Sequence, residues 1–498
     1  MSFLGLDIGT GGCKAVVFSE SGKELAASYR EYPLIRPYPG WAELDSNDVI
    51  QKCFEVIREV NAMMEDPVQA MCISSQGEAF TPIDRHGNIL NNAMVSSDTR
   101  AQNLSVSWSR SFGEEKIYQI TGHTPHPLFT LYKILWLKEN KPTTWSDTFQ
   151  FLCFEDLFQY KVGIEPHISW PLAGRTMMFD VINHQWNSEI LDALKLSPSQ
   201  LARPVASGDV AGYIELSIAQ TLGFKNRIMV VAGGHDQTCA ALGAGVTKSG
   251  VCMYATGTVE CFCPMLETSS FTDELRKNNL CCYDFAIKGK YTTVAYSLTG
   301  GNILRWMRDE LGHEEVLNAQ QTSQNAYSLL LDQMPDEPTD LLVLPYFSST
   351  GTPYFDTKAK GAIIGLQLTT QKAEITKALL EGVALEMKLN LQLMEESGMV
   401  IDSFIATGGG TRNKRWTQLK ADVLNKAIVT RNVKEAGCYG AAMLAASAFT
   451  NQSVEALINR NSIDSEVTVP DPGKAGIYEV KFNKYKQLYP LLKQFWKE

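Results

Sequence analysis

One short motif occurs twice, about half a chain apart, and this repeat limits the folds open to the sequence. Leu4–Thr10 is an apolar run that ends in Gly-Thr, and Val251–Thr258 has the same form. Two weakly similar halves, each with a Gly-Thr turn, predict two related domains that face a shared cleft. A chain of 498 residues is also too long for one compact core. We expect the boundary within residues 244–250, with a short hinge because no low-complexity linker marks it.

Strand-like apolar runs alternate with segments of helical period along the chain, which indicates an α/β protein. Asp45 is expected to cap a helix that runs to Met64. The expected strands are 4–8, 15–18, 70–74, 227–232, 250–255, 341–344 and 403–407. The other expected helices are 237–243, 301–311, 372–396 and 413–424.

Composition and charge exclude several classes of protein. The chain has 45 Lys and Arg against 55 Asp and Glu, a net charge of −10 without a long basic run. This balance argues against a nucleic-acid or membrane-surface partner. No secretory signal is present, and no apolar stretch approaches the roughly 18–20 residues of a membrane helix. The eleven cysteines fit no zinc-binding spacing, so we expect reduced, packed thiols and a cytoplasmic location.

The segment Asp7–Lys14 joins an acid at a strand end to several glycines and a hydroxyl group. Such a turn can hold hydrated Mg²⁺ and present backbone amides to phosphate oxygens. The alternative is a tight hairpin in which Asp7 only caps the turn. The P-loop pattern GxxxxGK[ST] is absent, which argues against a Walker-type nucleotide site.

Two further turns strengthen the phosphate interpretation. They are Thr256-Gly257-Thr258 in the second half and the glycine-rich segment Thr407–Asn413. Glycines between a strand and a helix let a flat ligand or a phosphate approach the backbone closely. The alternative is close packing of a helix on a strand, but the presence of three such turns favours nucleotide binding.

Asp236 follows a predicted strand and precedes a predicted helix, within Gly233–Gln237. A carboxylate there could accept the proton of an attacking hydroxyl group. The same position suits an ordinary helix cap, and spacing alone favours the cap. The neighbouring His235 is more typical of a packed, hydrogen-bonded residue.

Together these segments resemble the FGGY carbohydrate kinases, which belong to the superfamily of actin, Hsp70 and hexokinase. The likeness covers roughly residues 3–450 and depends on several blocks in order. Besides the turns above, the blocks are Pro39–Asp45, Ser97–Arg100, Gly361–Leu366, Leu380–Val383 and Gly440–Ala442. An ordered set of this kind is more specific than one glycine-rich loop.

The resemblance implies an α/β fold of two RNase H-like domains that flank a deep interdomain cleft. Residues 1–246 would bind the sugar and supply the first phosphate loop, residues 247–450 would bind ATP, and residues 451–498 would form a helical tail on the second domain. The resemblance also makes Asp236 the catalytic base, which reverses the preference for a cap.

ATP and Mg²⁺ are the cofactors that the resemblance implies. Asp7 and Asp236 would lie at the metal. The implied nucleotide-binding residues are Thr10, Gly11, Lys14, Gly257, Thr258, Gly301, Gly409, Gly410 and Asn413.

The implied sugar-contact loop contains Gln76, Gly77 and Glu78. Xylulose kinases typically carry Gln-Met-His-Gly there, and glycerol kinases Gln-Arg-Glu. Gly77 should enlarge or reshape the pocket. Glu78 would accept hydrogen bonds from two hydroxyl groups, although it could also be a salt-bridge partner. Asp98 and Phe129 complete the implied substrate set, together with Asp236.

These cues leave several substrates open. A ketopentose such as xylulose is the first expectation, with gluconate, glycerol or another polyol as alternatives. Gluconate is favoured by Gly122–Pro127, Lys133 and Trp136, which are similar to gluconate-kinase sequences. From other classes, the alternatives are an ATPase like the superfamily's chaperones and a sugar-binding protein without catalysis. The expected partner is a small molecule, and a homodimer is left open.

Overall fold

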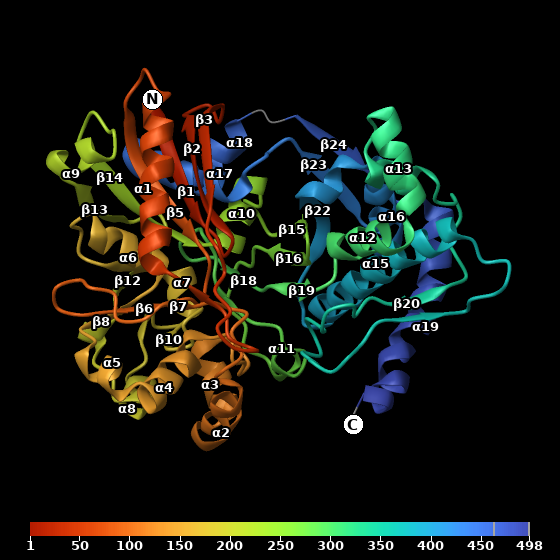
Figure 1. The fold of residues 1–498 in the computed structure, drawn as a ribbon, viewed down its shortest axis with the longest axis horizontal. Coiled ribbons are helices and arrows are strands. Elements are labelled where there is room, and N and C mark those ends of the chain that lie inside the picture. The colour runs from red at the N-terminus through yellow and green to blue at the C-terminus, as the bar shows by residue number, and fades with distance from the viewer. Residues whose placement is uncertain (462–463, 497–498) are drawn as a thin grey trace.

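The computed structural model describes residues 1–461 and 464–496, and its two largest sheets have six strands each (Figure 1). The first sheet has the order β13-β14-β5-β1-β2-β3, and the second has the order β24-β23-β22-β15-β16-β19. In the first sheet β14, β5 and β1 run parallel and the outer pairs are antiparallel. The second sheet has the same directions, strand for strand. The predicted internal repeat is therefore confirmed.

The strands of the first sheet are β1 (Ser2–Ile8), β2 (Gly12–Ser19), β3 (Glu24–Glu31), β5 (Val68–Ser75), β13 (Val210–Ile214) and β14 (Ile228–His235). Those of the second are β15 (Gly250–Thr256), β16 (Glu260–Pro264), β19 (Ala295–Ser297), β22 (Ile401–Thr407), β23 (Ala427–Arg431) and β24 (Ser465–Thr468). The short strands are β4 (Glu43–Leu44), β6 (Thr81–Ile83), β7 (Ala93–Met94), β8 (Gln150–Leu152), β9 (His167–Ser169), β10 (Phe179–Asp180), β11 (Gln185–Trp186), β12 (Arg203–Val205), β17 (Tyr283–Asp284), β18 (Tyr291–Thr292), β20 (Leu342–Leu344) and β21 (Ala362–Ile364).

The helices up to the end of the first sheet's half are α1 (Ser46–Ala62), α2 (Gln102–Phe112), α3 (Glu114–Thr121), α4 (Thr130–Asn140), α5 (Pro142–Asp147), α6 (Phe154–Lys161), α7 (Trp170–Gly174), α8 (Ser188–Leu194), α9 (Leu216–Thr221) and α10 (Asp236–Ala244). The later ones are α11 (Asp273–Lys277), α12 (Gly301–Trp306), α13 (His313–Thr322), α14 (Ala326–Asp332), α15 (Lys372–Glu396), α16 (Lys414–Leu424), α17 (Ala436–Thr450), α18 (Val454–Arg460) and α19 (Pro472–Leu492). Each strand and helix expected from the sequence overlaps one of these elements, but the expected helix 301–311 is α-helical only to Trp306 and continues as a π-helix over Met307–Leu311. Asp45 caps α1 as predicted, with its Oδ1 accepting a hydrogen bond from Asn47 N at 2.9 Å.

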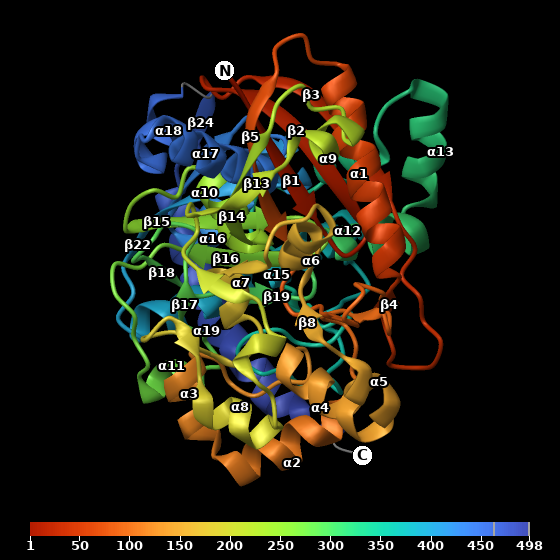
Figure 2. The same ribbon diagram turned by 90° about the vertical axis from the view of Figure 1, so that its left-hand side faces the viewer.

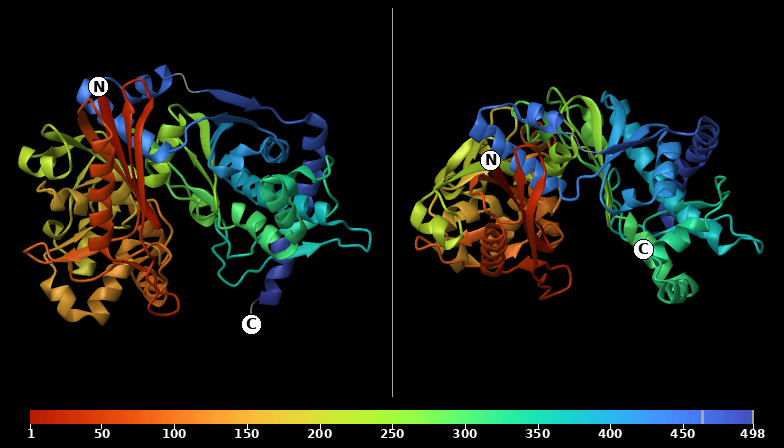
Figure 3. Two further views of the ribbon diagram at one scale, coloured as in Figure 1. Left: turned by 45° about the horizontal axis from the view of Figure 1, so that its top comes forward. Right: turned by 90° about the horizontal axis from the view of Figure 1, so that it is seen from above.

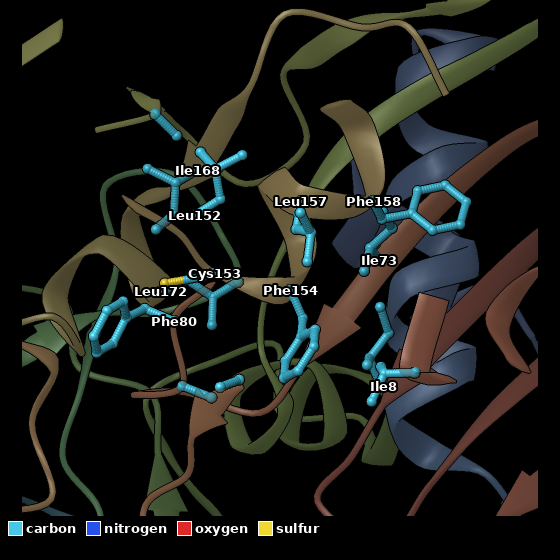
Figure 4. Close-up of a cluster of buried hydrophobic side chains, with 14 of the residues drawn as sticks. Ile8, Ile73, Phe80, Leu152, Cys153, Phe154, Leu157, Phe158, Ile168 and Leu172 are labelled. Atoms are coloured by element: carbon cyan, nitrogen blue, oxygen red, sulfur yellow. The ribbon is translucent and has the colours of Figure 1, made fainter. Parts of the chain in front are cut away.

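The central strands of the first sheet are apolar on both faces because helices cover both. Six of the seven residues of β1 are buried, as is usual for parallel strands inside an α/β sheet. Helix α1 packs on β1 and β2, and α17 packs on β1 and β5. Figure 4 shows Ile8 and Ile73 from the ends of β1 and β5 beside Phe154 and Leu157 of α6, all of them in one buried cluster. This core lies directly beneath the carboxyl ends of the strands.

Helices α10 and α17 join the two halves, and glycines let their backbones meet. A Cβ on Gly243 would lie 1.9 Å from the carbonyl oxygen of Ala436, and one on Gly440 would lie 2.1 Å from that of Cys239. No larger residue fits this crossing. The two halves diverge from the side where these helices meet (Figure 3).

The expected boundary at residue 246 falls in the connection between α10 and β15, but the two halves exchange elements on either side of it. Helix α17, from the predicted second domain, packs on the first sheet because Gly5 admits the carbonyl group of Cys438. Figure 2 shows α17 and α18 beside the strands of the first sheet.

The expectation for the tail, a helical segment on the second domain, is correct only for α19. Tyr478 and Phe482 of α19 lie in the core of the second half. Helix α18 instead packs in the cluster that contains Phe3 and Phe18, and β24 is an edge strand rather than a helix.

Candidate active site

The carboxyl ends of β1, β5 and β14 bring three separate segments together. We call Asp7–Lys14, Ser74–Glu78 and His235–Asp236 the first edge. The strand register pairs Asp7 with Ser74, and His235 with Ser75. In open α/β sheets ligands bind outside this end of the parallel strands.

Asp7 and the loop after it are held by the neighbouring strand. Ser74 Oγ donates a hydrogen bond to Asp7 Oδ1 at 2.6 Å. Thr10 Oγ1 donates to Gln76 Oε1 at 3.2 Å, and Gln76 Nε2 donates to the carbonyl group of Gly9 at 3.0 Å. Burial raises the pKa of Asp7, and the hydrogen bond from Ser74 offsets this only in part. Asp7 is half-buried and bonds to Ser74 on the neighbouring strand, and a carboxylate whose pKa is raised in this way is suited to a cation.

Asp236 is the first residue of α10, and its carboxylate has unused hydrogen-bonding capacity. Among the described residues its Oδ1 has no hydrogen-bond partner, and its side chain is 35% exposed. His235 Nε2 lies 3.1 Å away but without the geometry of a hydrogen bond. Burial, with the charges of Asp7 and Glu78, raises the pKa of Asp236 to about 7. The cap position of α10 is held by His235, and Asp236 is an acidic residue of the first turn rather than the N-cap that spacing favours.

Glu155 on α6 supports the segment before Asp236, and sequence reasoning missed it. The pairing of β14 with β5 shifts register between Val231 and Gly234, which leaves the Gly233 N–H outside the ladder. Glu155 Oε1 accepts that N–H at 2.7 Å, and its Oε2 accepts from Ser169 N at 2.9 Å. The bulge that turns the chain toward Asp236 is thus satisfied by a fully buried carboxylate.

The structure corrects what the sequence suggested for Gly77 and Glu78. A Cβ on Gly77 would lie 3.4 Å from Arg175 Cβ and 3.3 Å from the His235 ring, so the space that glycine leaves is already occupied. Glu78 is 3% exposed, and its Oε1 accepts from Arg175 Nε at 2.7 Å. Its Oε2 accepts from Ser96 Oγ at 2.7 Å. Glu78 is the salt-bridge partner of the alternative reading rather than an acceptor for two sugar hydroxyl groups.

Charge at Glu78 is stabilised by its surroundings. Burial alone would raise the pKa of Glu78, but Arg175, His235 and Lys133 outweigh it and lower that pKa to about 2. Lys133 donates to the carbonyl group of Glu78 at 3.3 Å. The loop that contains Gln76, Gly77 and Glu78 is therefore built on an ion pair whose cation, Arg175, comes from another segment.

Asp98 and Phe129 belong to the interior rather than to an open site. The Asp98 side chain is fully buried, and its Oδ2 accepts from Ala42 N at 2.7 Å and from Arg100. Arg100 in turn stacks on Trp41 at 3.6 Å. Phe129 is 4% exposed because it begins α4 and packs against the His123 ring. Both side chains are buried in this structure, and their role in substrate binding stays a prediction.

The second sheet places a glycine-lined cavity at the corresponding strand ends. We call Thr256–Thr258, Gly300–Gly301 and Gly408–Asn413 the second edge. A cavity of about 490 Å³ there is bordered by Leu304, Tyr327 and Trp416. Six residues of the predicted nucleotide set also line it: Gly257, Thr258, Gly301, Gly409, Gly410 and Asn413.

Glycine is required at this edge by close backbone approach. A Cβ on Gly301 would lie 2.8 Å from the carbonyl oxygen of Gly257, and one on Gly410 would lie 2.9 Å from Thr256 Oγ1. Gly408 has a φ of +93°, which side chains rarely tolerate. Asn413 begins α16 and accepts Trp416 N at 3.1 Å through its Oδ1. The cavity is therefore shaped by backbone, with few charged groups.

Two contacts link the first edge, or the residue next to it, to segments of the second half. Lys14 Nζ of the first edge lies 2.6 Å from Glu435 Oε2, just before α17. Cys261 Sγ on β16 lies 3.0 Å from Gln237 Oε1, next to Asp236. Thr10 and Gly11 are exposed beside them, with no atom near the Cβ position of Gly11. The predicted phosphate loop is thus open and adjacent to the second half.

The described residues offer no preformed metal cluster, no membrane-spanning helix and no disulfide bond. In residues 1–461 and 464–496 no group of three or more His, Cys, Asp or Glu side chains could hold a metal ion. Within the same ranges no helix has both the length and the apolarity for a membrane crossing. All eleven cysteines are free and buried, as the sequence predicted.

Comparisons with known proteins point in one direction. Models of the N-terminal and C-terminal domains of the FGGY family of carbohydrate kinases match residues 2–243 and 252–449. The xylulose kinase of Staphylococcus xylosus is 26% identical over 494 residues, 98% of this chain and 99% of that protein. The gluconokinase of Bacillus subtilis is 26% identical over 447 residues, 89% of this chain and 86% of that protein. The solved structure of ligand-bound xylulose kinase from Lactobacillus acidophilus superposes with a TM-score of 0.91 at 23% identity, covering 99% of each chain.

Proposed function

The chain belongs to the FGGY family of carbohydrate kinases, and on that premise we propose that it transfers the γ-phosphoryl group of ATP to a hydroxyl group of a ketopentose such as xylulose. Full-length similarity to xylulose kinases supports this substrate class. Gluconate stays the second candidate, because a gluconokinase is as similar in identity although over a shorter span.

The observation that carries the proposal is the carboxylate of Asp236. Its Oδ1 is free of partners among the described residues, and its pKa is raised to about 7. A general base works best when its pKa lies near the working pH. In the proposed reaction Asp236 accepts the proton of the attacking hydroxyl group while the oxygen of that group bonds to the γ-phosphorus. ADP leaves with the electron pair of the broken phosphorus–oxygen bond.

In the proposed reaction the second edge binds the adenosine part of ATP, and both edges bind its phosphate chain. The adenosine part would lie in the cavity at Gly301, Gly409, Gly410 and Asn413. Gly257 and Thr258 would face the phosphate chain from one side, and Thr10, Gly11 and Lys14 from the other. Exposed backbone N–H groups in glycine turns suit this role because they donate to phosphate oxygens without side-chain obstruction.

The half-buried pair Asp7 and Asp236 fits Mg²⁺, which usually keeps several waters and takes only one or two carboxylates from the protein. Both groups have raised pKa values because burial leaves their charge poorly solvated, so a cation would stabilise their ionised forms. When bound, Mg²⁺ would shield the negative charge of the phosphates. The cytoplasmic location and a homodimer stay predictions.

A coupled assay of ADP release tests the proposal. The purified chain is supplied with ATP and Mg²⁺, and xylulose, xylitol, gluconate and glycerol are compared with no acceptor. We expect xylulose to give the highest kcat/KM, with little ADP release when no acceptor is present. Equal ADP release with and without every acceptor would instead support the ATPase alternative.

A further inference from the structure

Arg175 lies at the first edge although it is remote in sequence from every segment of that edge. It follows α7 and occupies the space beside Gly77 that a side chain would otherwise fill. Arg175 Cβ lies 3.4 Å from the position of a Cβ on residue 77. The His235 ring lies 3.3 Å from the same Cβ position, and His235 Nε2 lies 3.1 Å from Asp236 Oδ1, so His235 links Arg175 to the proposed base. The side of the first edge next to His235 is thus covered by Arg175 rather than by a side chain at position 77.

The hydrogen bonds of Arg175 show which of its donors remain. Its Nε and Nη2 donate to Glu78, and Nη1 lies 3.1 Å from His123 Nε2. His123 Nδ1 lies 2.7 Å from the carbonyl oxygen of Thr121, which can only accept, so Nδ1 carries the proton and Nε2 accepts from Arg175. Burial lowers the pKa of His123 to about 3, so this ring is neutral. One N–H on each terminal nitrogen of Arg175 is left for a ligand.

Two aromatic rings lie over the guanidinium of Arg175, so a ligand can approach its free N–H groups only in the plane of the group. The ring of Phe129 lies 5.1 Å from Arg175 Cζ, and the ring of Tyr283 lies 5.5 Å from it. Aromatic faces flank the cation, and its side chain retains 13% exposure. Coplanar donors of this kind match oxygen lone pairs that lie in one plane, as in a carbonyl group.

A hydroxyl group suits this position less well than a carbonyl oxygen. A hydroxyl group must also find an acceptor for its own proton, but the nearby Glu78 is buried and already accepts from Arg175 and Ser96. A carboxylate would add a negative charge close to Asp236 and Asp7. The charge of Arg175 is already balanced by Glu78. The other nearby cation, Lys133, is fully buried and donates to the carbonyl groups of Glu78 and Met94, so neither cation is free to pair with a carboxylate.

We propose that Arg175, held by Glu78 and His123, determines specificity by donating hydrogen bonds to the carbonyl oxygen of a neutral ketose. This inference rests on the proposed function and adds the group by which the substrate is selected. Xylulose and xylitol differ at that carbon only, which is a carbonyl group in one and an alcohol in the other, so they form the test pair.

The test compares kcat/KM for xylulose and for xylitol in the wild type, Arg175→Lys and Arg175→Gln. Loss of a charge-assisted pair of hydrogen bonds should raise KM for xylulose about tenfold or more, with a smaller effect on kcat. KM for xylitol should change about twofold at most. The preference for xylulose over xylitol should therefore fall about tenfold, while KM for ATP stays unchanged.

Arg100→Lys is the matched control. Arg100 is another buried arginine paired with two carboxylates, Asp98 and Glu43, but its side chain is 1% exposed. This variant should lose thermal stability without changing the xylulose-to-xylitol preference. Should Arg175→Gln fold poorly, the double variant Glu78→Gln/Arg175→Gln removes the unpaired buried charge and should show the same loss of preference.

The outcomes separate this inference from the function beneath it. A wild type that turns over xylulose, with the same preference in all Arg175 variants, would overturn the role of Arg175 and leave the kinase assignment intact. A wild type that prefers xylitol or gluconate would overturn the ketose substrate and the carbonyl contact together. Binding of xylulose to Asp236→Asn, measured by calorimetry with and without Arg175→Gln, checks the contact independently of turnover.

Discussion

The two sheets share strand order and direction, yet the chemistry at their functional edges differs. The first edge carries titratable groups, among them Asp7 and Asp236, whose pKa values are raised by burial. The second edge is formed by glycine backbone around a cavity of about 490 Å³. The difference teaches that a repeated fold supplies two equivalent strand-end platforms and that side chains at a few positions give each its role. Changes at the first edge should affect the transfer step and the sugar, and changes at the second should affect ATP.

The largest expected effect is that of Asp236→Asn. The amide cannot accept the proton of the attacking hydroxyl group, so kcat should fall by about three orders of magnitude. KM for ATP should change less than about twofold because the ATP cavity lies at the other edge. Steady-state kinetics of ADP release measure both constants. Turnover near that of the wild type would remove the base assignment and with it the contrast between the edges.

The raised pKa of Asp236 predicts a pH dependence for the first edge alone. The group accepts a proton only when ionised, and burial raises its pKa to about 7. Hence kcat/KM for xylulose should fall about tenfold per pH unit below that value and level off above it. Nucleotide binding, measured separately by calorimetry with ADP, should show no matching step. A flat rate profile between about pH 5.5 and 8.5 would contradict the role of Asp236 as base.

At the second edge, Gly301→Ala should raise KM for ATP about tenfold with a small effect on the sugar. The new Cβ would lie 2.8 Å from the carbonyl oxygen of Gly257 and must displace backbone that lines the cavity. Gly476→Ala on α19 is the control, because no atom lies within 4 Å of its Cβ position. An unchanged KM for ATP in Gly301→Ala would show that the cavity does not bind the nucleotide.

The smallest expected effect concerns the ion pair between Lys14 of the first edge and Glu435, the residue before α17. Both side chains are about one-third exposed, at 28% and 32%, so the pair should contribute less than about 1 kcal/mol to stability. Glu435→Gln should free Lys14 for the phosphates and lower KM for ATP about two- to threefold. Glu479→Gln breaks the Lys388–Glu479 pair, also 2.6 Å long, and is the control. A higher KM for ATP in Glu435→Gln would contradict this role of Lys14.

The features that the sequence predicted well are those encoded locally. In a segment such as Leu4–Thr10, the apolar residues that form the strand and the Gly-Thr that forms its turn are adjacent in the sequence. The segment can therefore be recognised without knowledge of distant contacts. The same holds for Gly408–Gly410, where the glycines between a strand and a helix allow close approach of the backbone. The topological repeat of the two sheets followed from two such motifs because equivalent strands occupy equivalent places.

The features that it missed depend on contacts between distant segments. Arg175 and Glu78 are 97 residues apart, and Glu155 and Gly233 are 78 residues apart, so no local pattern links either pair. The burial of an individual polar side chain also cannot be predicted from a single sequence. Asp98 matches a family block but has no exposed side-chain surface. The guanidinium of its partner Arg100 lies 3.6 Å from the ring centre of Trp41 and 4.9 Å from that of Trp136.

A crystal structure with xylulose and a non-hydrolysable ATP analogue tests the central claim most directly. The account predicts the adenosine group in the cavity beside Gly301 and Gly409, the γ-phosphate between Thr10 and Thr258, and a sugar hydroxyl group within hydrogen-bond distance of Asp236. A nucleotide bound elsewhere, or a sugar whose hydroxyl groups lie away from Asp236, would contradict it.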